Sequence, residues 1–333
     1  MLHPVKLLIF TGAVALAQSA PPPIIDIHLR ALNAASQGPP PLSVCAPPTA
    51  YSSVESAAAW PPAFLSLLRN TSCDHPIRSP LTDDDLMEQT LAILKRRNII
   101  AVTSGPRTEQ WHKAANDRII PGLMFNLQPD DPSLSAMRSM FQSGRFKVFG
   151  EVGIQYRGIH PADFRFEPYL ALAEELDIPL AIHIGAGPSG EPITAGAGAL
   201  RARVQSLLVL EAPLLRHPRL RVVALHAGWP TLDDTVAMLW AHPQLHVDVG
   251  LISFAIPRAA FHSYLRTIVD AGFGKRVLFG SDQMVWPRAL EVAIDSIESA
   301  PFLTPSQKRD ILYNNAARFL RLSQDHNPRH NGN

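Results

Sequence analysis

The chain has 333 residues, 46% of them hydrophobic, and is therefore long enough for one large α/β barrel or for two modest domains. Its 30 basic and 29 acidic residues leave a formal net charge of +1, which excludes the strongly basic surface typical of proteins that bind nucleic acid or anionic membranes. We therefore expect a small-molecule substrate rather than a polymeric partner.

Residues 1–20 have the pattern of a cleaved signal peptide. Lys6 precedes an apolar run over 7–17, and small residues follow it. The run is too short to span a bilayer, so we expect no stable membrane span after cleavage and a periplasmic or extracellular location. A buried or amphipathic N-terminal helix is the alternative. In an oxidising compartment the pair Cys45 and Cys73 favours a disulfide, while two unpaired thiols remain the other interpretation.

An apolar run at 24–28 predicts the first strand, and the stretch from about 30 to 80 then interrupts the pattern. Ten prolines lie between Pro21 and Pro62. Proline breaks helices and lacks a backbone donor, so this stretch is predicted to be an ordered insertion rather than a regular strand and helix unit. We expect it to lie over the mouth of the fold and to form part of a substrate lid.

From Thr82 onward, predicted helices and strands alternate. Thr82 is a candidate N-cap, because three aspartates follow it where negative charge suits the helix dipole, and this helix should run to about residue 97. Seven further strands are predicted at 99–103, 119–126, 148–151, 180–183, 220–226, 245–249 and 277–279. Further helices are predicted near 109–117, 132–142, 167–176, 201–215, 232–240, 259–270, 288–298 and 305–320.

Eight strands separated by helical connections predict a parallel (β/α)₈ barrel, the TIM barrel, over residues 21–325, followed by a polar tail at 326–333. A doubly wound open sheet is the alternative fold. No Gly-x-Gly-x-x-Gly follows the first strand and no Walker-type loop occurs, so nothing supports a nucleotide cofactor.

Five of the predicted strands end in a side chain that can bind a metal. Charged and imidazole groups are costly in apolar strands unless they share a polar site, and the tips of barrel strands converge on one face. Mixed nitrogen and oxygen donors of this kind suit Zn²⁺, Mn²⁺ or Fe²⁺. The five residues are His28, Glu151, His183, His226 and Asp282. The histidines predicted not to be ligands, because they lie away from the tips, are His160, His217, His242, His246 and His262.

The ordered set resembles the amidohydrolase superfamily, specifically its amidohydrolase-related (amidohydrolase 2) branch. The resemblance implies a metal-dependent hydrolase or, in one branch, a non-oxidative decarboxylase of carboxylated aromatic or dienoic substrates. It also implies that the strand-tip residues are metal ligands, with Asp282 as ligand and proton acceptor, and it is compatible with a homodimer. The resemblance covers about 24–320 and rests on Asp26-x-His28, Gly150-Glu151-Val152-Gly153, His183, His226-Ala227-Gly228-Trp229-Pro230 and Gly280-Ser281-Asp282.

One position departs from the family pattern, because Arg30 stands where a second histidine usually follows His28. A guanidinium has no lone pair to donate to a metal. We therefore expect one ion rather than two, and predict that Arg30 occupies the region of the second cation. There it would pair with Asp282 or Glu151, or grip a substrate carboxylate. The alternative is that Arg30 turns outward from a degraded site.

These residues predict metal-assisted hydrolysis of an amide, ester or lactone, with Asp282, His226 and Arg30 as the catalytic set. Substrate contacts are expected from Tyr156, Arg157 and Trp229, and packing of their own loop is the alternative for the first two. A glycine-rich loop at 185–198 is expected to act as a mobile flap. Two other classes stay open: a decarboxylase on the same barrel, and a silent binding protein in which Arg30 has abolished metal use.

Overall fold

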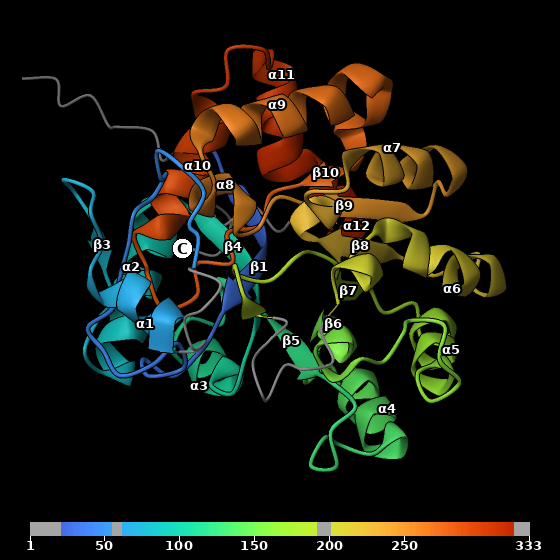
Figure 1. The fold of residues 1–333 in the computed structure, drawn as a ribbon. Helices are drawn as coiled ribbons and strands as arrows, with labels where there is room; N and C mark the ends of the chain where they lie inside the picture. Colours follow the sequence, from blue (N-terminus) through green and yellow to red (C-terminus); the bar gives the residue numbers. More distant parts are fainter. Residues whose placement is uncertain (1–20, 55–61, 192–200, 323–333) are drawn as a thin grey trace, which may run out of the picture.

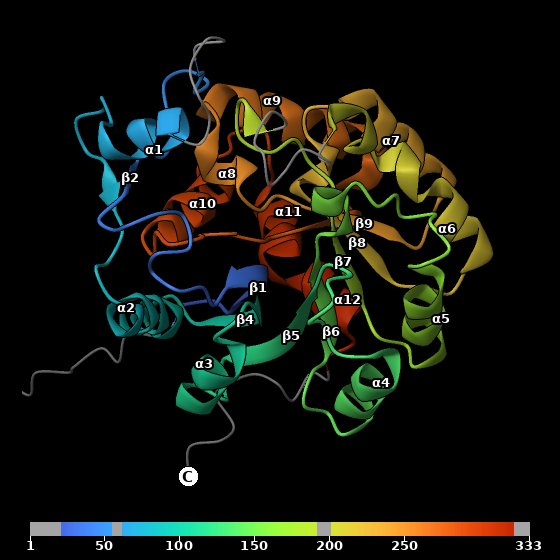
Figure 2. The same ribbon diagram turned by 60° about the horizontal axis from the view of Figure 1, so that its bottom comes forward.

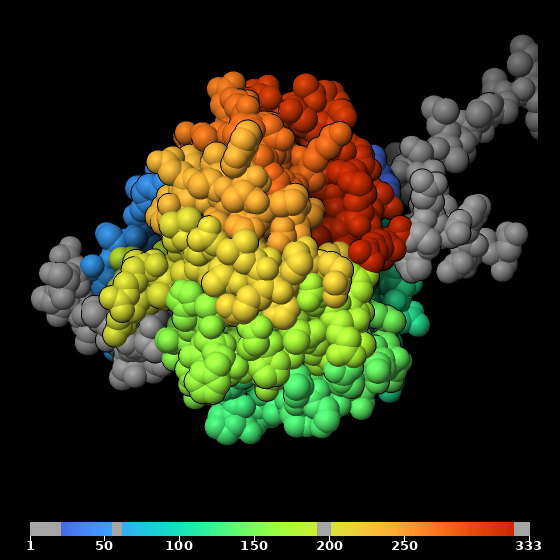
Figure 3. Space-filling view, turned by 90° about the vertical axis from the view of Figure 1, so that its right-hand side faces the viewer, coloured from blue at the N-terminus to red at the C-terminus, as the bar shows by residue number. Residues whose placement is uncertain are grey.

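Eight parallel strands form a nearly closed barrel with helices around it in the computed structural model, which describes residues 21–54, 62–191 and 201–322 (Figure 1). The strands follow one another around the barrel in sequence order. On the outer surface in Figure 3, the chain segments follow one another in a similar order, coloured from green through yellow and orange to red. The predicted TIM barrel is confirmed. Its strands are β1 (Ile24–Arg30), β4 (Ile99–Ser104), β5 (Ile119–Phe125), β6 (Val148–Val152), β7 (Leu180–His183), β8 (Val222–Leu225), β9 (Leu245–Asp248) and β10 (Val277–Leu278).

The first and last strands close the ring through backbone hydrogen bonds. Ile27 N donates to Phe279 O at 3.0 Å, and Asp282 N donates to His28 O at 2.7 Å. The buried Asp26 adds a side-chain link, because its Oδ1 accepts from the backbone N–H groups of His28 and Ser281, both at 2.9 Å. Burial raises the pKa of Asp26 to about 6. The closure brings the tips of β1 and β10 together.

Two apolar cores support the barrel. Side chains of six strands pack inside it with Phe319 of α12 (Asn315–Leu320), and a larger core fills the space between the strands and the outer helices. The inner group contains Ile25, Ile27, Val102, Val148, Ala181, Val223, Leu225 and Leu278. Because every strand is buried on both faces, its sequence is almost continuously apolar, as is typical of parallel sheets.

The outer helices match most of the predicted ranges. They are α2 (Asp83–Arg96), α3 (Thr108–Ala114), α4 (Leu134–Gln142), α5 (Glu167–Glu175), α7 (Leu232–Ala241), α9 (Arg258–Ile268), α10 (Ala289–Glu298) and α11 (Pro305–Arg309). The predicted N-cap is confirmed, since the Thr82 side chain accepts from Asp85 N at 3.1 Å. The helix predicted over 201–215 was wrong in its extent. Two 3₁₀ turns and the short α6 (Glu211–Arg216) replace it, and Ser206 separates the two turns by accepting from Leu208 N with its side chain.

The insertion leaves the barrel after β1 and returns at α2. It contains α1 (Pro62–Arg69) and an antiparallel pair, β2 (Ser43–Val44) with β3 (Ile77–Arg78) (Figure 2). A disulfide joins Cys45 to Cys73, so the interpretation with unpaired thiols was wrong. Together with α8 (Ile252–Ala255) and the loops after β7 and β8, the insertion lines a cavity of about 900 Å³ at the carboxyl ends of the strands.

Among the described helices, none combines the length and apolar character that crossing a membrane requires. The predicted signal at 1–20 lies outside the described residues, as do the tail at 326–333 and positions 192–198 of the glycine-rich loop.

Replacing both Cys45 and Cys73 with Ser should lower stability, because the disulfide closes a loop of 28 residues that the unfolded chain otherwise explores freely. A loss on the order of 3 kcal/mol in the free energy of unfolding is expected from loop entropy. Denaturant unfolding with and without reductant measures it. Reductant should destabilise the natural protein and leave the double variant unchanged; an equal response of both would contradict the prediction.

Candidate metal centre

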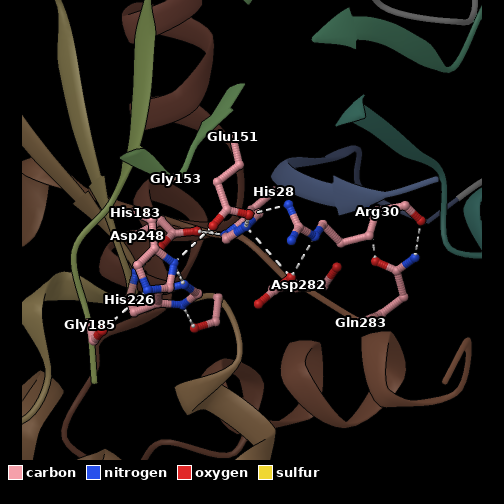
Figure 4. A network of polar contacts seen from close by, with 12 residues as sticks. His28, Arg30, Glu151, Gly153, His183, Gly185, His226, Asp248, Asp282 and Gln283 are labelled. Atoms are coloured by element: carbon pink, nitrogen blue, oxygen red, sulfur yellow. Dashed lines mark hydrogen bonds and ion pairs between the residues drawn. The ribbon is translucent and has the colours of Figure 1, made fainter. Parts of the chain in front are cut away.

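The five predicted strand-tip residues converge on one buried cluster (Figure 4). His28, Glu151, His183, His226 and Asp282 come from β1, β6, β7 and the segments directly after β8 and β10, and each is at most 5% exposed. Figure 4 shows their polar atoms facing a common centre. The structure also adds Asp248, the last residue of β9, which was not among the predicted site residues.

Irregular strand register turns two of these side chains toward the centre. Between Asp26 and Leu29, β1 advances three residues while its partner β4 advances two. Between Phe149 and Val152, β6 does the same against β7. One extra residue in a strand re-aims the side chains around it, and such bulges are common next to active sites. Here they coincide with His28 and Glu151.

Each of the three histidines uses its outer ring nitrogen to donate to a fixed acceptor. His28 Nδ1 lies 2.9 Å from Asp248 Oδ2, His183 Nε2 lies 3.2 Å from Gly185 O, and His226 Nδ1 lies 3.0 Å from Gly250 O. In a ring that binds a metal, an N–H opposite each of these acceptors leaves the other nitrogen free for the cation. The other ring nitrogen of each histidine is left facing the cluster. Histidines that bind metals are anchored in this way.

Asp248 holds two of those histidines at once. Its Oδ2 accepts from His28 Nδ1, and its Oδ1 accepts from the backbone N–H of His226 at 2.6 Å. A glycine next to the pair makes room for it, since a Cβ at Gly280 would lie 2.2 Å from Asp248 Oδ2. An acidic residue at the end of an apolar strand was the signal that could have identified Asp248 from the sequence.

Arg30 points into the cluster and forms ion pairs with both of its inner carboxylates. Its guanidinium donates to Glu151 Oε2, and its Nε lies 3.2 Å from Asp282 Oδ1. The side chain of Gln283 fixes the Arg30 backbone, accepting from its N–H at 2.9 Å and donating to its carbonyl at 2.7 Å. The alternative in which Arg30 turns outward was therefore wrong.

The charges in the cluster shift its pKa values in opposite directions. Burial raises the pKa of Glu151, but the Arg30 charge and the polar contacts with the His183 and His28 rings outweigh burial and hold that pKa well below its ordinary value. Burial lowers the pKa of His28, yet the Asp282 and Asp248 carboxylates raise it well above its usual range. Burial and the neighbouring His183 lower the pKa of His226, which favours a neutral ring.

The inward-facing donors fit a divalent cation. His183 Nδ1 lies 2.8 Å from Glu151 Oε1 and 3.2 Å from His226 Nε2, so two anchored imidazoles direct ring nitrogens at the same point. Asp282 Oδ1 is buried and has no hydrogen-bond partner among the described residues. Three nitrogen donors and carboxylate oxygens form a set suited to zinc or a similar ion. Two groups of three residues could hold it. One is Glu151, His183 and His226, and the other is His28, His226 and Asp248.

The predicted substrate-binding residues lie in different surroundings. The Tyr156 hydroxyl is 3.4 Å from His183 Nδ1, and burial followed by the charge of Glu151 raises its pKa well above the ordinary value. Trp229 lines the 900 Å³ cavity and stacks on Tyr51 with ring centroids 5.8 Å apart. Arg157 does not join the cluster, because its guanidinium donates to Leu127 O at 2.8 Å. The five histidines predicted not to be ligands belong to neither metal-capable group.

Replacing Asp248 with Asn should weaken zinc binding by about 10- to 100-fold, the usual effect of losing the anchor of a metal-binding histidine. The amide nitrogen of Asn would face one of the two N–H groups that Asp248 now accepts. Competition with a chromophoric chelator measures the dissociation constant. Asp270→Asn, on an exposed residue, is the matched control and should bind zinc like the natural protein. Equal affinities in the two variants would contradict the role of Asp248.

Three solved structures have a similar fold. An uncharacterised TIM-barrel protein from Bordetella bronchiseptica shares 18% identity with a TM-score of 0.60, over 90% of this chain and 98% of that one. A probable 2-pyrone-4,6-dicarboxylic acid hydrolase from Acinetobacter baumannii, with citric acid bound, shares 14% with a TM-score of 0.56 over 90% and 99%. A 5-carboxyvanillate decarboxylase from Sphingomonas paucimobilis shares 17% with a TM-score of 0.50 over 80% and 88%. At these identities the likeness is one of fold.

No protein with curated annotation matches the chain. The family model Amidohydro_2, described as amidohydrolase, matches residues 82–322, from the cap of α2 to the end of the described chain. The matched part contains Glu151, His183, His226 and Asp282, whereas β1 with His28 and Arg30 precedes it. Since the match covers most of the 333 residues, this protein belongs to the Amidohydro_2 family of amidohydrolase-related TIM-barrel proteins.

Proposed function

We propose that this protein is a metal-dependent hydrolase that cleaves an amide, ester or lactone bond of a small molecule. The observation that carries the proposal is Asp282, whose Oδ1 is buried between Arg30 Nε at 3.2 Å and His28 Nε2 at 3.6 Å and receives no hydrogen bond from the described residues. A carboxylate in that position can take a proton from a water molecule at the cluster. Membership of the family and the buried donor set support the same chemistry.

The inward nitrogens of His28, His183 and His226, with Glu151, would hold one divalent cation. Zinc suits this imidazole-rich set best, and manganese and iron are the alternatives. When bound, the cation lowers the pKa of water toward about 7 and polarises the scissile carbonyl. The histidines are oriented for this before any ligand arrives, because Asp248 and the Gly185 and Gly250 carbonyls fix their rings.

Residues around the cation would carry out the other steps of the reaction. Asp282 accepts the proton of the attacking water and passes it to the leaving group. His226 would act on the carbonyl through the cation that its Nε2 helps to hold, and the Tyr156 hydroxyl, which keeps its proton, can donate a hydrogen bond to the substrate. Arg30 offsets the negative charge of Glu151 and Asp282 in the space that a second cation would otherwise take.

The pairing of Arg30 favours hydrolysis over decarboxylation. The substrate of a decarboxylase carries a carboxylate, and Arg30, the basic side chain in the cluster, is already engaged by two carboxylates of the protein, which leaves the cation as the group that could hold it. The anchored histidines argue against a silent binding protein, since a site without metal has no need of three imidazoles held in this orientation.

We also propose that the protein is exported. The pattern of residues 1–20 supports this, and so does the disulfide between Cys45 and Cys73, because such bonds persist in oxidising compartments.

Replacing Asp282 with Asn should lower kcat by about 10²- to 10⁴-fold, the usual contribution of a general base. A panel of lactones, esters, amides and aromatic carboxylates, followed for both acid release and carbon dioxide release, identifies the reaction. Metal content per chain is measured alongside, to separate loss of the base from loss of the ion. Asp270→Asn should keep full activity. Carbon dioxide release without hydrolysis in the natural protein would overturn the hydrolase proposal.

Replacing Arg30 with His should raise the bound metal from one ion per chain toward two, because an imidazole can donate to the second cation and a guanidinium cannot. Elemental analysis of protein purified without chelator gives the count. Arg30→Lys keeps a positive charge without a free lone pair, and should stay at one ion. An unchanged count in Arg30→His would contradict the idea that Arg30 replaces a cation.

A further inference from the structure

We infer that the substrate of this site is an uncharged, largely apolar ester or lactone that carries an aromatic or alkyl group, and not a carboxylated compound. The inference rests on the proposed hydrolase function and extends it to the class of substrate. Its basis is the cavity over the metal centre, whose described lining contains no Lys or Arg, together with the engagement of Arg30 by two carboxylates of the protein.

The cavity meets the cluster at one residue, His226, and is lined on its other side by residues of the insertion. Its wall includes His226, which also belongs to the candidate metal centre, and its volume of about 900 Å³ can accept a molecule of drug size. Aromatic rings form much of the wall, contributed by Tyr51, Phe64, Trp229, Phe254 and Trp286. The Trp286 Nε1–H already donates to Leu42 O at 3.2 Å, so only its apolar ring remains for a ligand.

Positive charge is missing from the described wall of the cavity. No Lys or Arg lines it, and its carboxylate is Asp74, which would repel an anion. The two segments that the structure does not describe between residues 54 and 201, at 55–61 and 192–200, contain no Lys or Arg in their sequence. Hydroxyl groups such as those of Ser43 and Thr49 can bind neutral polar substituents.

Two arginines that the sequence suggested for substrate binding or catalysis are both occupied. Arg30 is paired with Glu151 and Asp282, and Arg157 donates to Leu127 O outside the cluster. A substrate carboxylate held in the cavity would therefore meet no basic side chain among the described residues that line it, and would have to break the Arg30 ion pairs or displace the water on the cation to find a partner. Burying an unpaired carboxylate is costly, whereas burying a neutral aromatic group is favourable.

A matched pair of probes that contain no hydrolysable bond tests this class directly on the zinc-loaded protein. They are 2-phenyltetrahydrofuran and 4-(tetrahydrofuran-2-yl)benzoate, which differ only in the carboxylate. Isothermal titration should show the neutral probe binding at least about ten-fold more tightly, because only the charged one must bury an unpaired carboxylate. The corresponding lactones, γ-phenyl-γ-butyrolactone and its 4-carboxyphenyl analogue, should show the same preference in kcat/KM.

Two variants locate the effect in the cavity wall. Leu67→Arg places a cation in the wall and should narrow or reverse the preference for the neutral probe. Leu81→Arg, at a residue that is 63% exposed and outside the lining, adds the same charge and should leave the preference unchanged.

The outcomes separate this inference from the hydrolase proposal. Tighter binding of the neutral probe without hydrolysis of either lactone would support an uncharged, apolar ligand for the cavity and contradict lactone hydrolysis. Hydrolysis with a preference for the carboxylated lactone would retain the hydrolase and overturn the substrate class. Equal binding of the two probes, or binding of neither, would also overturn it.

Discussion

The ion pairs of Arg30 with Glu151 and Asp282 are the interaction on which the barrel mouth depends. Three carboxylates are buried here, counting Asp248, and a single guanidinium offsets only part of their charge. Buried charges that lack partners are strongly destabilising, so the rest must be balanced by a proton on His28 or by a metal ion. The raised pKa of His28 shows the same excess of negative charge. The cluster is thus arranged to attract one cation, while Arg30 fills the space for another.

The geometry around the cluster holds its side chains in position for a cation before one binds. Bulges in β1 and β6 turn His28 and Glu151 inward, and Asp248 ties His28 to the backbone of His226. Gly280 leaves the room that this pair needs. A site held by strands and buried hydrogen bonds loses little conformational entropy on binding, which is the advantage of building it on rigid elements. The insertion contributes to the wall of the cavity over the centre. That wall is largely apolar, and its described lining contains no Lys or Arg.

Most of the barrel and five members of the site were predictable because both depend on local information. The signals used were apolar runs of strand length, the cap at Thr82 and the polar residues at strand tips. Each of these signals involves only a few neighbouring residues. The predictions failed where contacts between residues far apart in the sequence determine the local structure. The segment over 201–215 has helical composition. Ser206 nevertheless interrupts it, because its side chain caps the following turn and donates a hydrogen bond to the Asp234 carboxylate. Asp248 carries the same local signal as the other strand-tip residues, but its role as an anchor depends on partners 22 and 220 residues away, which the sequence does not show.

The sequence by itself determined the fold class, the convergence of His28, Glu151, His183, His226 and Asp282, and the departure at Arg30, because strand periodicity and residue type are properties of the chain alone. Only the tertiary structure decided that Arg30 turns inward to two carboxylates, that Cys45 pairs with Cys73, and that the insertion makes an apolar cavity over the centre. Each of these depends on which side chains meet after the ring of strands has closed, and loop geometry, which sets those meetings, has no periodic signal in the sequence.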